Sequence, residues 1–209
     1  NLAGILVAGS LTFIFCVIAS LAVSVRHLVR LDAIASSDSL TGLPNRRALH
    51  KDILKHSADG SDVALALLDL DGFKQVNDHY GHFVGDNAIR QCAEIFCQVA
   101  DGDGQVYRLG GDEYAILIGG PLAGTLLEGL CRRIIERLTK PVQVDERRLT
   151  LGTSIGLSQD NEAGRVGSSE LLRRADVAMY ASKRGGKMRC TWFNASFDKS
   201  REQLKEMDD

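Results

Sequence analysis

The stretch QVYRLGGDEYAILI, residues 105–118, decides the fold because it sets a glycine pair and two acids between two short apolar runs. Such runs around a glycine turn are typical of a β-hairpin. Gly110 and Gly111 permit backbone conformations that other residues disfavour, and they let a ligand approach the main chain. If strand pairing continues through the turn, the carboxylates of Asp112 and Glu113 point to opposite faces. The pattern fits a functional acidic turn or a solvated hairpin, and these residues alone do not decide between the two.

A second pair of acids stands at the end of an apolar run. Residues 63–70 predict a buried strand that ends in Asp69, with Asp71 two positions later. Mg²⁺ prefers oxygen ligands and usually takes one or two carboxylates together with substrate phosphates. Asp69, Asp112 and the main-chain carbonyl of Leu70 would suffice for such a site. Solvation of the strand end is the alternative, and for Asp71 we favour solvation or capping of the next helix.

A compact polar segment follows this strand. It contains Lys74, Asn77, Asp78, His82 and Asp86, and it is interrupted by Gly81 and Gly85. An amide and a carboxylate can together recognise the edge of guanine. The carboxylate accepts hydrogen bonds from the ring N–H and the amino group, and the amide binds the acceptor face. Asp86 fits that role, and it fits equally well as the N-cap of a helix expected at residues 87–99. His82 taken alone is more typical of a packed or surface histidine.

Helical and strand patterns alternate along the chain. The helices are expected at residues 46–56, 73–80, 87–99, 122–138 and 170–182, and the strands at 63–70, 105–109, 114–118, 149–157 and 190–193. This alternation predicts a single α/β domain of about 150 residues in which helices cover a mixed sheet.

The first 25 residues are apolar and carry no charge. A bilayer span needs about 20 such residues, and the basic residues Arg26, His27 and Arg30 that follow favour the cytoplasmic side. We therefore expect a transmembrane helix at 1–25 in the inner membrane, a connecting helix at 26–37, and the rest of the chain in the cytoplasm. The alternative is a signal peptide, which would carry its basic residues before the apolar run.

Composition excludes some classes of function. The net charge is −2, from 25 basic and 27 acidic residues, so the chain is not expected to bind nucleic acid through general charge. The five cysteines lack the paired spacing of a zinc site and predict buried, reduced thiols. Residues 194–209 are charged and predict a helical linker that leads on to another domain. We interpret the chain as part of a longer protein.

Four segments together resemble a known family. They are DSLTGLPNRR (38–47), LDLDGFKQVNDHYGHFVGD (68–86), RLGGDEY (108–114) and ADVAMYASKRGGK (175–187). In this order and spacing they resemble the GGDEF family of diguanylate cyclases. The resemblance covers about residues 36–193 and indicates a GGDEF catalytic domain at 38–193. It implies a palm-like α/β fold related to nucleotide cyclases and polymerases.

The resemblance also implies roles for individual residues. By position, Asp69 and Asp112 resemble ligands of Mg²⁺, with Mn²⁺ as an alternative, and the Leu70 carbonyl completes the site. Asn77 and Asp86 resemble a guanine-binding pair, His82 contacts substrate, and Gly110 and Gly111 lie against the nucleotide. Lys74 stabilises transition-state charge, while Lys183 and Lys187 hold the terminal phosphates unless they are only solvated residues at a helix end. Glu113 activates the attacking hydroxyl or binds a second metal ion.

The implied reaction joins two GTP molecules into cyclic di-GMP and releases pyrophosphate. One domain binds one GTP, so the resemblance implies a homodimer. A domain that binds GTP without turnover and regulates an adjacent phosphodiesterase is the main alternative, and a palm-fold enzyme for another nucleotide is a third.

The chain departs from the family pattern at a few positions. Tyr114 stands where Phe is usual, and we expect activity to survive if the added hydroxyl finds a partner. Residues 101–104 lack the arginine of the family's inhibitory product site, so product inhibition through that site is not expected. Met188 replaces an asparagine that is common in the family.

Overall fold

The structure is a computed structural model of the 209-residue chain, and it describes residues 18, 20–24, 26–27, 35–160 and 166–197. Two compact units, 1–37 and 38–209, make up the chain. Most of the predicted transmembrane helix and most of the predicted connecting helix lie outside the described residues. The same holds for residues 198–209 of the predicted linker. Within the residues that are described, no helix is both long enough and apolar enough to cross a membrane.

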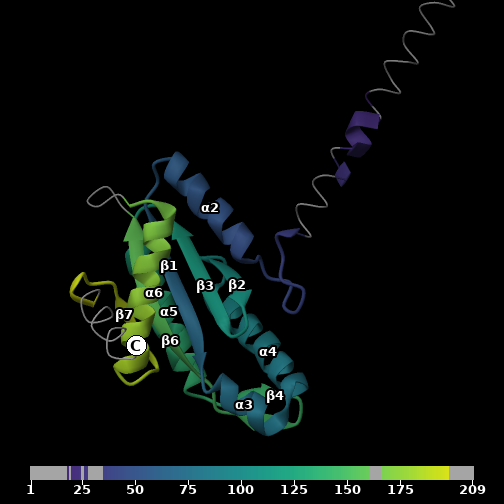
Figure 1. The fold of residues 1–209 in the computed structure, drawn as a ribbon, viewed down its shortest axis with the longest axis vertical. Coiled ribbons are helices and arrows are strands. Elements are labelled where there is room, and N and C mark those ends of the chain that lie inside the picture. Colours follow the sequence, from purple (N-terminus) through teal and green to yellow (C-terminus); the bar gives the residue numbers. More distant parts are fainter. Residues whose placement is uncertain (1–17, 19, 25, 28–34, 161–165, 198–209) are drawn as a thin grey trace, which may run out of the picture. The chain divides into compact units, whose positions relative to one another are not determined.

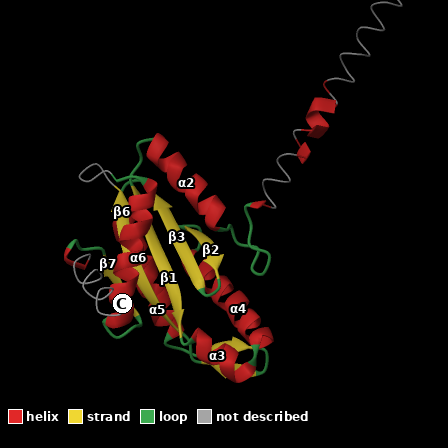
Figure 2. Cartoon of the chain, in the orientation of Figure 1, coloured by secondary structure: helices red, strands yellow, loops and turns green. Residues whose placement is uncertain are grey.

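The second unit is built on a five-stranded sheet with helices on both faces (Figures 1 and 2). The strand order is β2-β3-β1-β6-β7, with β7 parallel to β6 and the other neighbours antiparallel. The strands are β1 Val63–Asp71, β2 Gln105–Gly110, β3 Glu113–Gly119, β6 Gly152–Asp160 and β7 Arg189–Trp192. The helices are α2 Arg46–Ala58, α3 Phe73–Tyr80, α4 His82–Ala100, α5 Ala123–Leu138 and α6 Ser168–Arg184. The predicted mixed sheet with covering helices is confirmed.

A small second sheet was not predicted. It pairs β4, Val142–Val144, with β5, Arg147–Leu149. Strands of three residues are too short to show an alternating pattern, so the sequence carries no usable signal for them. The strand expected at 149–157 accordingly begins later, at Gly152.

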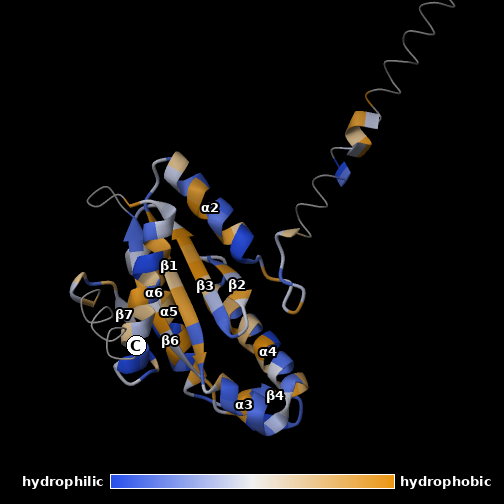
Figure 3. Ribbon diagram, viewed as in Figure 1, coloured by the Kyte–Doolittle hydropathy of each residue, from blue (hydrophilic) through white to orange (hydrophobic). Residues whose placement is uncertain are grey.

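Strand β1 lies at the centre of the sheet and is buried on both faces, which is why its sequence is almost continuously apolar (Figure 3). Its even-numbered residues, from Ala64 to Leu70, pack with α4 and α5. The odd-numbered residues Val63, Leu65 and Leu67 pack with α2 and α6. Because side chains two positions apart share a face, Asp69 and Asp71 continue the odd-numbered face toward α2 and α6.

Helix α4 begins at His82, five residues before the expected start at residue 87. Gly81, with a φ of 82°, interrupts the helical backbone between α3 and α4. Val84 and Gly85 are buried in the first turn of α4. Asp86 therefore lies inside the helix, and the interpretation of Asp86 as an N-cap is wrong. The early start places His82 and Asp86 on the same helix.

The cysteines that the structure describes are unpaired thiols, and not all are buried as predicted. Cys92 and Cys131 are buried, Cys190 is half-buried and Cys97 is exposed. Burial raises the pKa of the Cys92 thiol to about 12, so this thiol stays protonated at neutral pH.

Candidate active site

The predicted β2–β3 hairpin is present, and its turn depends on both glycines. Gly110 and Gly111 have φ angles of 133° and 53°, a region that residues with a side chain rarely adopt. The pairing register shifts between Arg108 and Gly110, and β3 starts only at Glu113. Asp112 therefore lies in the turn itself, and strand alternation does not set its direction.

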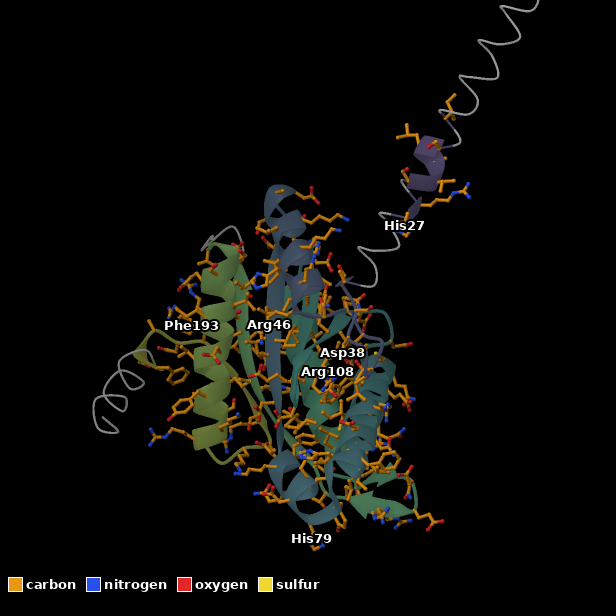
Figure 4. All side chains as sticks on the ribbon, turned by 45° about the vertical axis from the view of Figure 1, so that its right-hand side comes forward. His27, Asp38, Arg46, His79, Arg108 and Phe193 are labelled. Carbon is orange, nitrogen blue, oxygen red and sulfur yellow. The ribbon has the colours of Figure 1, made fainter. Side chains whose placement is uncertain are left out.

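A buried arginine holds this turn to the beginning of the domain. The Arg108 side chain is 9% exposed and donates hydrogen bonds from Nε and Nη2 to the Gly111 carbonyl, at 3.2 and 2.8 Å. Its Nη1 donates to Asp38 Oδ1 at 2.8 Å, and Figure 4 shows these two side chains next to each other. The Arg108 main-chain N–H also donates to the Pro44 carbonyl at 2.9 Å. The glycine turn is thus anchored to residues 38–45.

Asp38 is kept ionised in this contact. Burial raises the pKa of its carboxyl, but hydrogen bonds from Thr41 and Arg108 outweigh burial and hold the pKa below its usual value. Thr41 donates both its N–H, at 2.9 Å, and its hydroxyl, at 2.7 Å. The sequence analysis assigned no role to Asp38 or Arg108, because a lone arginine in a strand gives no sign that its side chain is buried.

The structure brings the two predicted metal ligands together. The Leu70 N–H donates to the Asp112 carbonyl at 3.2 Å, which joins the end of β1 to the glycine turn. Burial is the main cause that raises the pKa of Asp69, and the negative charges of Asp112 and Asp71 add to the increase. The negative charge of Asp112 thus acts on Asp69, and neighbouring carboxylates of this kind attract a cation.

A cationic side chain already lies at this acid pair. Lys183 Nζ is 2.7 Å from Asp69 Oδ2, and the Asp69 side chain is only 15% exposed. Among the described residues, no three His, Cys, Asp or Glu side chains form a metal cage. Mg²⁺ usually completes its shell with main-chain oxygens, water and substrate, so Asp69 and Asp112 fit a cation of this kind. Lys183, which was predicted to hold phosphates, instead forms an ion pair with a predicted metal ligand.

Glu113 lies on the same sheet face as Asp69. The two residues are paired across β1 and β3. The Glu113 Oε2 atom is 3.1 Å from Nη2 of Arg46, the first residue of α2. Both side chains are about half exposed, at 54% and 43%, so the pair orients Glu113 but contributes little stability.

The predicted guanine-binding residues lie on two adjacent helices. Asn77 is on α3 and Asp86 is on α4, and these helices pack against each other. The Asn77 Oδ1 atom is buried, and no group in the described part of the chain donates a hydrogen bond to it. A Cβ at Gly85 would collide with this same atom, so Gly85 makes the room for the amide. A buried acceptor without a partner is unfavourable, and a donor group of a ligand would satisfy it.

The other predicted substrate-binding residues are accessible. Lys74 in the first turn of α3, His82 at the start of α4, and Asp86 are exposed. Lys187 lies in the loop after α6 and is exposed as well. A Cβ at Gly110 or Gly111 would meet no atom within 4 Å, so open space adjoins the glycine pair.

Asp71 has a different role from the one predicted. The N-cap position of α3 is Gly72, and no side chain caps this helix. The Asp71 carboxylate instead accepts hydrogen bonds from Ser154 and from the Met188 N–H. The predicted capping role of Asp71 is therefore wrong, because the strand continues through this half-buried residue and its carboxylate binds Ser154 on β6 and the loop before β7.

The added hydroxyl of Tyr114 finds a partner, as the sequence analysis required. The residue is fully buried, and its hydroxyl donates to the Ile89 carbonyl on α4 at 2.8 Å. The ring packs edge-on against Phe96, with centroids 5.0 Å apart. The hydroxyl thus ties β3 to α4, the helix that carries Asp86.

We expect Tyr114→Phe to lower the free energy of unfolding by about 1 kcal/mol, because one neutral hydrogen bond is lost while the ring stays packed. Urea denaturation measures the change. Tyr107→Phe is the matched comparison and should cost more, since the Tyr107 hydroxyl is 2.6 Å from a carboxylate oxygen of Asp52. A loss above about 3 kcal/mol for Tyr114→Phe would contradict this account.

A protein-family model described as "Diguanylate cyclase, GGDEF domain" matches residues 35–189. The chain belongs to the GGDEF family. The cyclic di-GMP phosphodiesterase PdeR of Escherichia coli is 37% identical over 161 residues, which are 76% of this chain and 24% of PdeR. The bifunctional diguanylate cyclase/cyclic di-GMP phosphodiesterase MucR of Pseudomonas aeruginosa is 35% identical over 198 residues, 91% of this chain and 28% of MucR. The chain thus spans about a quarter of the length of these relatives.

The fold of this GGDEF domain is also that of solved structures. The coiled coil and GGDEF domain of DgcB from Caulobacter crescentus, in complex with c-di-GMP, superposes with a TM-score of 0.71 at 29% identity. The match covers 83% of this chain and 94% of the DgcB chain. The family and its α/β fold, which the four motifs indicated, are confirmed.

Proposed function

We propose that this GGDEF domain is a diguanylate cyclase that condenses two GTP molecules into cyclic di-GMP and pyrophosphate. The observation that supports the proposal is the hydrogen bond from the Leu70 N–H to the Asp112 carbonyl, which joins the end of β1, where Asp69 lies, to the glycine turn. The chain keeps both acids of the turn, and it places open space beside Gly110 and Gly111. A regulatory domain without turnover does not need these acids for chemistry.

The phosphates of GTP bind at this acidic end of the sheet. Asp69, Asp112 and the Leu70 carbonyl would hold Mg²⁺ or Mn²⁺, which neutralises phosphate charge and activates a hydroxyl for attack. Lys183 and Lys187 contact the terminal phosphates, and Lys74 stabilises charge that develops in the transition state. In this arrangement Lys183 exchanges its partner Asp69 for a phosphate when nucleotide binds. Glu113, held by Arg46, is the candidate for accepting the proton of the 3′-hydroxyl.

The base of GTP binds between α3 and α4. Asn77 supplies the buried acceptor that lacks a partner, Asp86 supplies a carboxylate, and His82 contacts substrate. Guanine offers a ring N–H and an amino group as donors, whereas adenine lacks the ring N–H. The pocket therefore favours GTP over ATP, which separates a cyclase for GTP from a palm-fold enzyme for another nucleotide.

Two copies of the chain are needed for the reaction, because each domain has one set of these residues and the product contains two nucleotides. Bringing two bound nucleotides into line supplies much of the acceleration in such a reaction. We also propose that residues 1–25 anchor the protein in the inner membrane, with the GGDEF domain in the cytoplasm. The uncharged stretch and the basic residues directly after it support this placement.

A second candidate function is that of a GTP-binding regulatory domain without turnover, acting on an adjacent phosphodiesterase domain. PdeR, which is named as a phosphodiesterase, supports this candidate, whereas the name of MucR includes both activities; the matched region is about a quarter of the length of each. The two candidates share the nucleotide pocket, and they differ in whether Asp69 and Asp112 are used for chemistry.

The experiment that separates the candidates is incubation of the purified full chain, in mild detergent, with GTP and Mg²⁺. We expect cyclic di-GMP to form at a rate that rises with chain concentration, and the rate to fall at least about 100-fold for Asp112→Asn. Thermal unfolding of this variant is the control for folding, and GTP binding by the unchanged chain is measured separately. GTP binding without product at any chain concentration would favour the regulatory candidate, and absence of GTP binding would contradict both.

A further inference from the structure

Asp71 is the acid of the β1 end that the proposed reaction does not use. Its carboxylate accepts the Ser154 hydroxyl at 2.9 Å on Oδ1 and 3.1 Å on Oδ2. Oδ2 also accepts the Met188 N–H at 3.2 Å. Asp71 thereby joins β1, β6 and the loop between α6 and β7.

This loop has an unusual backbone. Gly186, Lys187 and Met188 all have positive φ, at 112°, 62° and 46°. The left-handed region suits glycine and is disfavoured for Lys and Met, so such a turn persists only where surrounding contacts hold it. Asparagine, which is common in the family at position 188, tolerates this conformation better than methionine does. In this chain the turn therefore depends more on its contacts.

Asp71 makes one of the hydrogen bonds that hold the turn. The Lys187 N–H donates to the Ser182 carbonyl at 3.1 Å, which fixes the start of the turn to α6. The Met188 N–H is held by Asp71, and a Cβ at Gly152 would lie 2.5 Å from Met188 Sδ and 3.2 Å from Asp71 Cβ. Gly152 thus leaves the space in which the Met188 side chain packs beside Asp71.

We propose that Asp71 is a positioning residue for the phosphate end of the nucleotide site. Its carboxylate holds the left-handed turn of residues 186–188, and this turn sets the position of Lys187. Asp71 and Asp69 share one face of β1, and Lys183 of α6 binds Asp69, so the turn follows directly on the helix that reaches the acid pair. The inference rests on the proposed function, in which Lys187 contacts the terminal phosphates of GTP.

The test compares binding of GTP with binding of GMP, which lacks the terminal phosphates. Affinities are measured by calorimetry on the full chain without turnover. We expect Asp71→Ala to weaken GTP binding about tenfold and to change GMP binding less than about twofold. Lys187→Ala should do the same, and the double variant should bind GTP no more weakly than Lys187→Ala alone. A role in general folding would instead lower both affinities.

Two gentler variants keep the test decisive if Asp71→Ala does not fold. Asp71→Asn keeps an oxygen acceptor for the Met188 N–H and should retain most of the GTP affinity. Met188→Asn should relieve the strained turn, so that Asp71→Asn in this background loses less GTP affinity than it does alone. Equal losses for GTP and GMP, or additive losses with Lys187→Ala, would overturn the inference and leave the proposed function standing. A wild-type chain that binds no GTP would overturn the proposed function, and the inference with it.

Discussion

Arg108→Met is expected to lower the free energy of unfolding by about 3–5 kcal/mol, because it leaves the Asp38 carboxylate charged and largely buried without its cationic partner. The Asp38 side chain is only 17% exposed, and the Gly111 carbonyl loses two hydrogen bonds at the same time. A domain of this size is stable by roughly 5–15 kcal/mol, so the variant should lose a large share of its stability. Denaturation with urea at neutral pH measures the change.

Arg46→Met is the matched control. Arg46 also forms an ion pair with a carboxylate, that of Glu113, but both side chains are about half exposed. Exposed pairs contribute about 0–1 kcal/mol, so the same substitution should cost little stability here. Equal costs for the two variants would show that burial of the Asp38–Arg108 pair does not matter. The double variant Asp38→Asn with Arg108→Met removes the stranded charge and should recover part of the loss.

The pH dependence gives a second readout of the same contact. In the folded chain the pKa of Asp38 is lowered, so the unfolded chain takes up this proton first as the pH falls. The stability that Asp38 contributes is therefore complete above the ordinary pKa of about 3.9 and is lost as the pH falls through the folded value. In Arg108→Met the hydrogen bond and charge that lower the pKa of Asp38 are gone, so burial raises this pKa relative to the unchanged chain. The loss of stability on acidification should therefore begin at a higher pH.

Gly85→Ala is expected to weaken GTP binding at least about 30-fold while the fold stays stable. The new Cβ would occupy the place of the Asn77 Oδ1 atom, and the Phe73 ring lies 3.3 Å away. Because the colliding atom is the end of a side chain, the protein can relieve the clash by turning the Asn77 amide out of its position. The nucleotide pocket would then lose the buried acceptor, and helix propensity would offset the strain by about 1 kcal/mol.

Gly129→Ala is the matched control for this prediction. Gly129 is also inside a helix, α5, but an added Cβ meets no atom closer than Arg133 Nη1 at 4.0 Å. Calorimetric titration with GTP and thermal unfolding should show unchanged affinity and unchanged or slightly raised stability. If Gly85→Ala binds GTP as tightly as Gly129→Ala does, the Asn77 amide does not recognise the base.

The sequence was sufficient for the parts of the fold that have long periodic patterns. The helices were predicted because apolar residues recur at the spacing of one buried face, and the central strand and the hairpin because continuous apolar runs stand next to turn residues. The start of α4 was missed, because Gly81 alone separates α3 from α4 and the polar residues before Asn87 resemble a loop. The β4–β5 pair was missed because its strands are three residues long.

The candidate site could likewise be predicted only in part from the sequence. Roles for Asp69, Asp112, Asn77 and Asp86 could be proposed from their types and spacing within recognisable motifs, and these roles stay predictions. Asp71 was misjudged, because its partners Ser154 and Met188 lie far along the chain. The same distance in sequence hides the contact between Asp38 and Arg108.

By itself, the sequence determined the family and the α/β class, and it singled out the candidate site residues, since these follow from residue types at short spacing. Only the tertiary structure decided which of those side chains are held and by what. Lys183 lies on Asp69, Asp71 holds a strained turn, and Arg108 anchors the glycine turn from within the protein. Burial and hydrogen bonding between segments that are distant in sequence set these contacts. Neither property can be predicted from the residues that are neighbours along the chain.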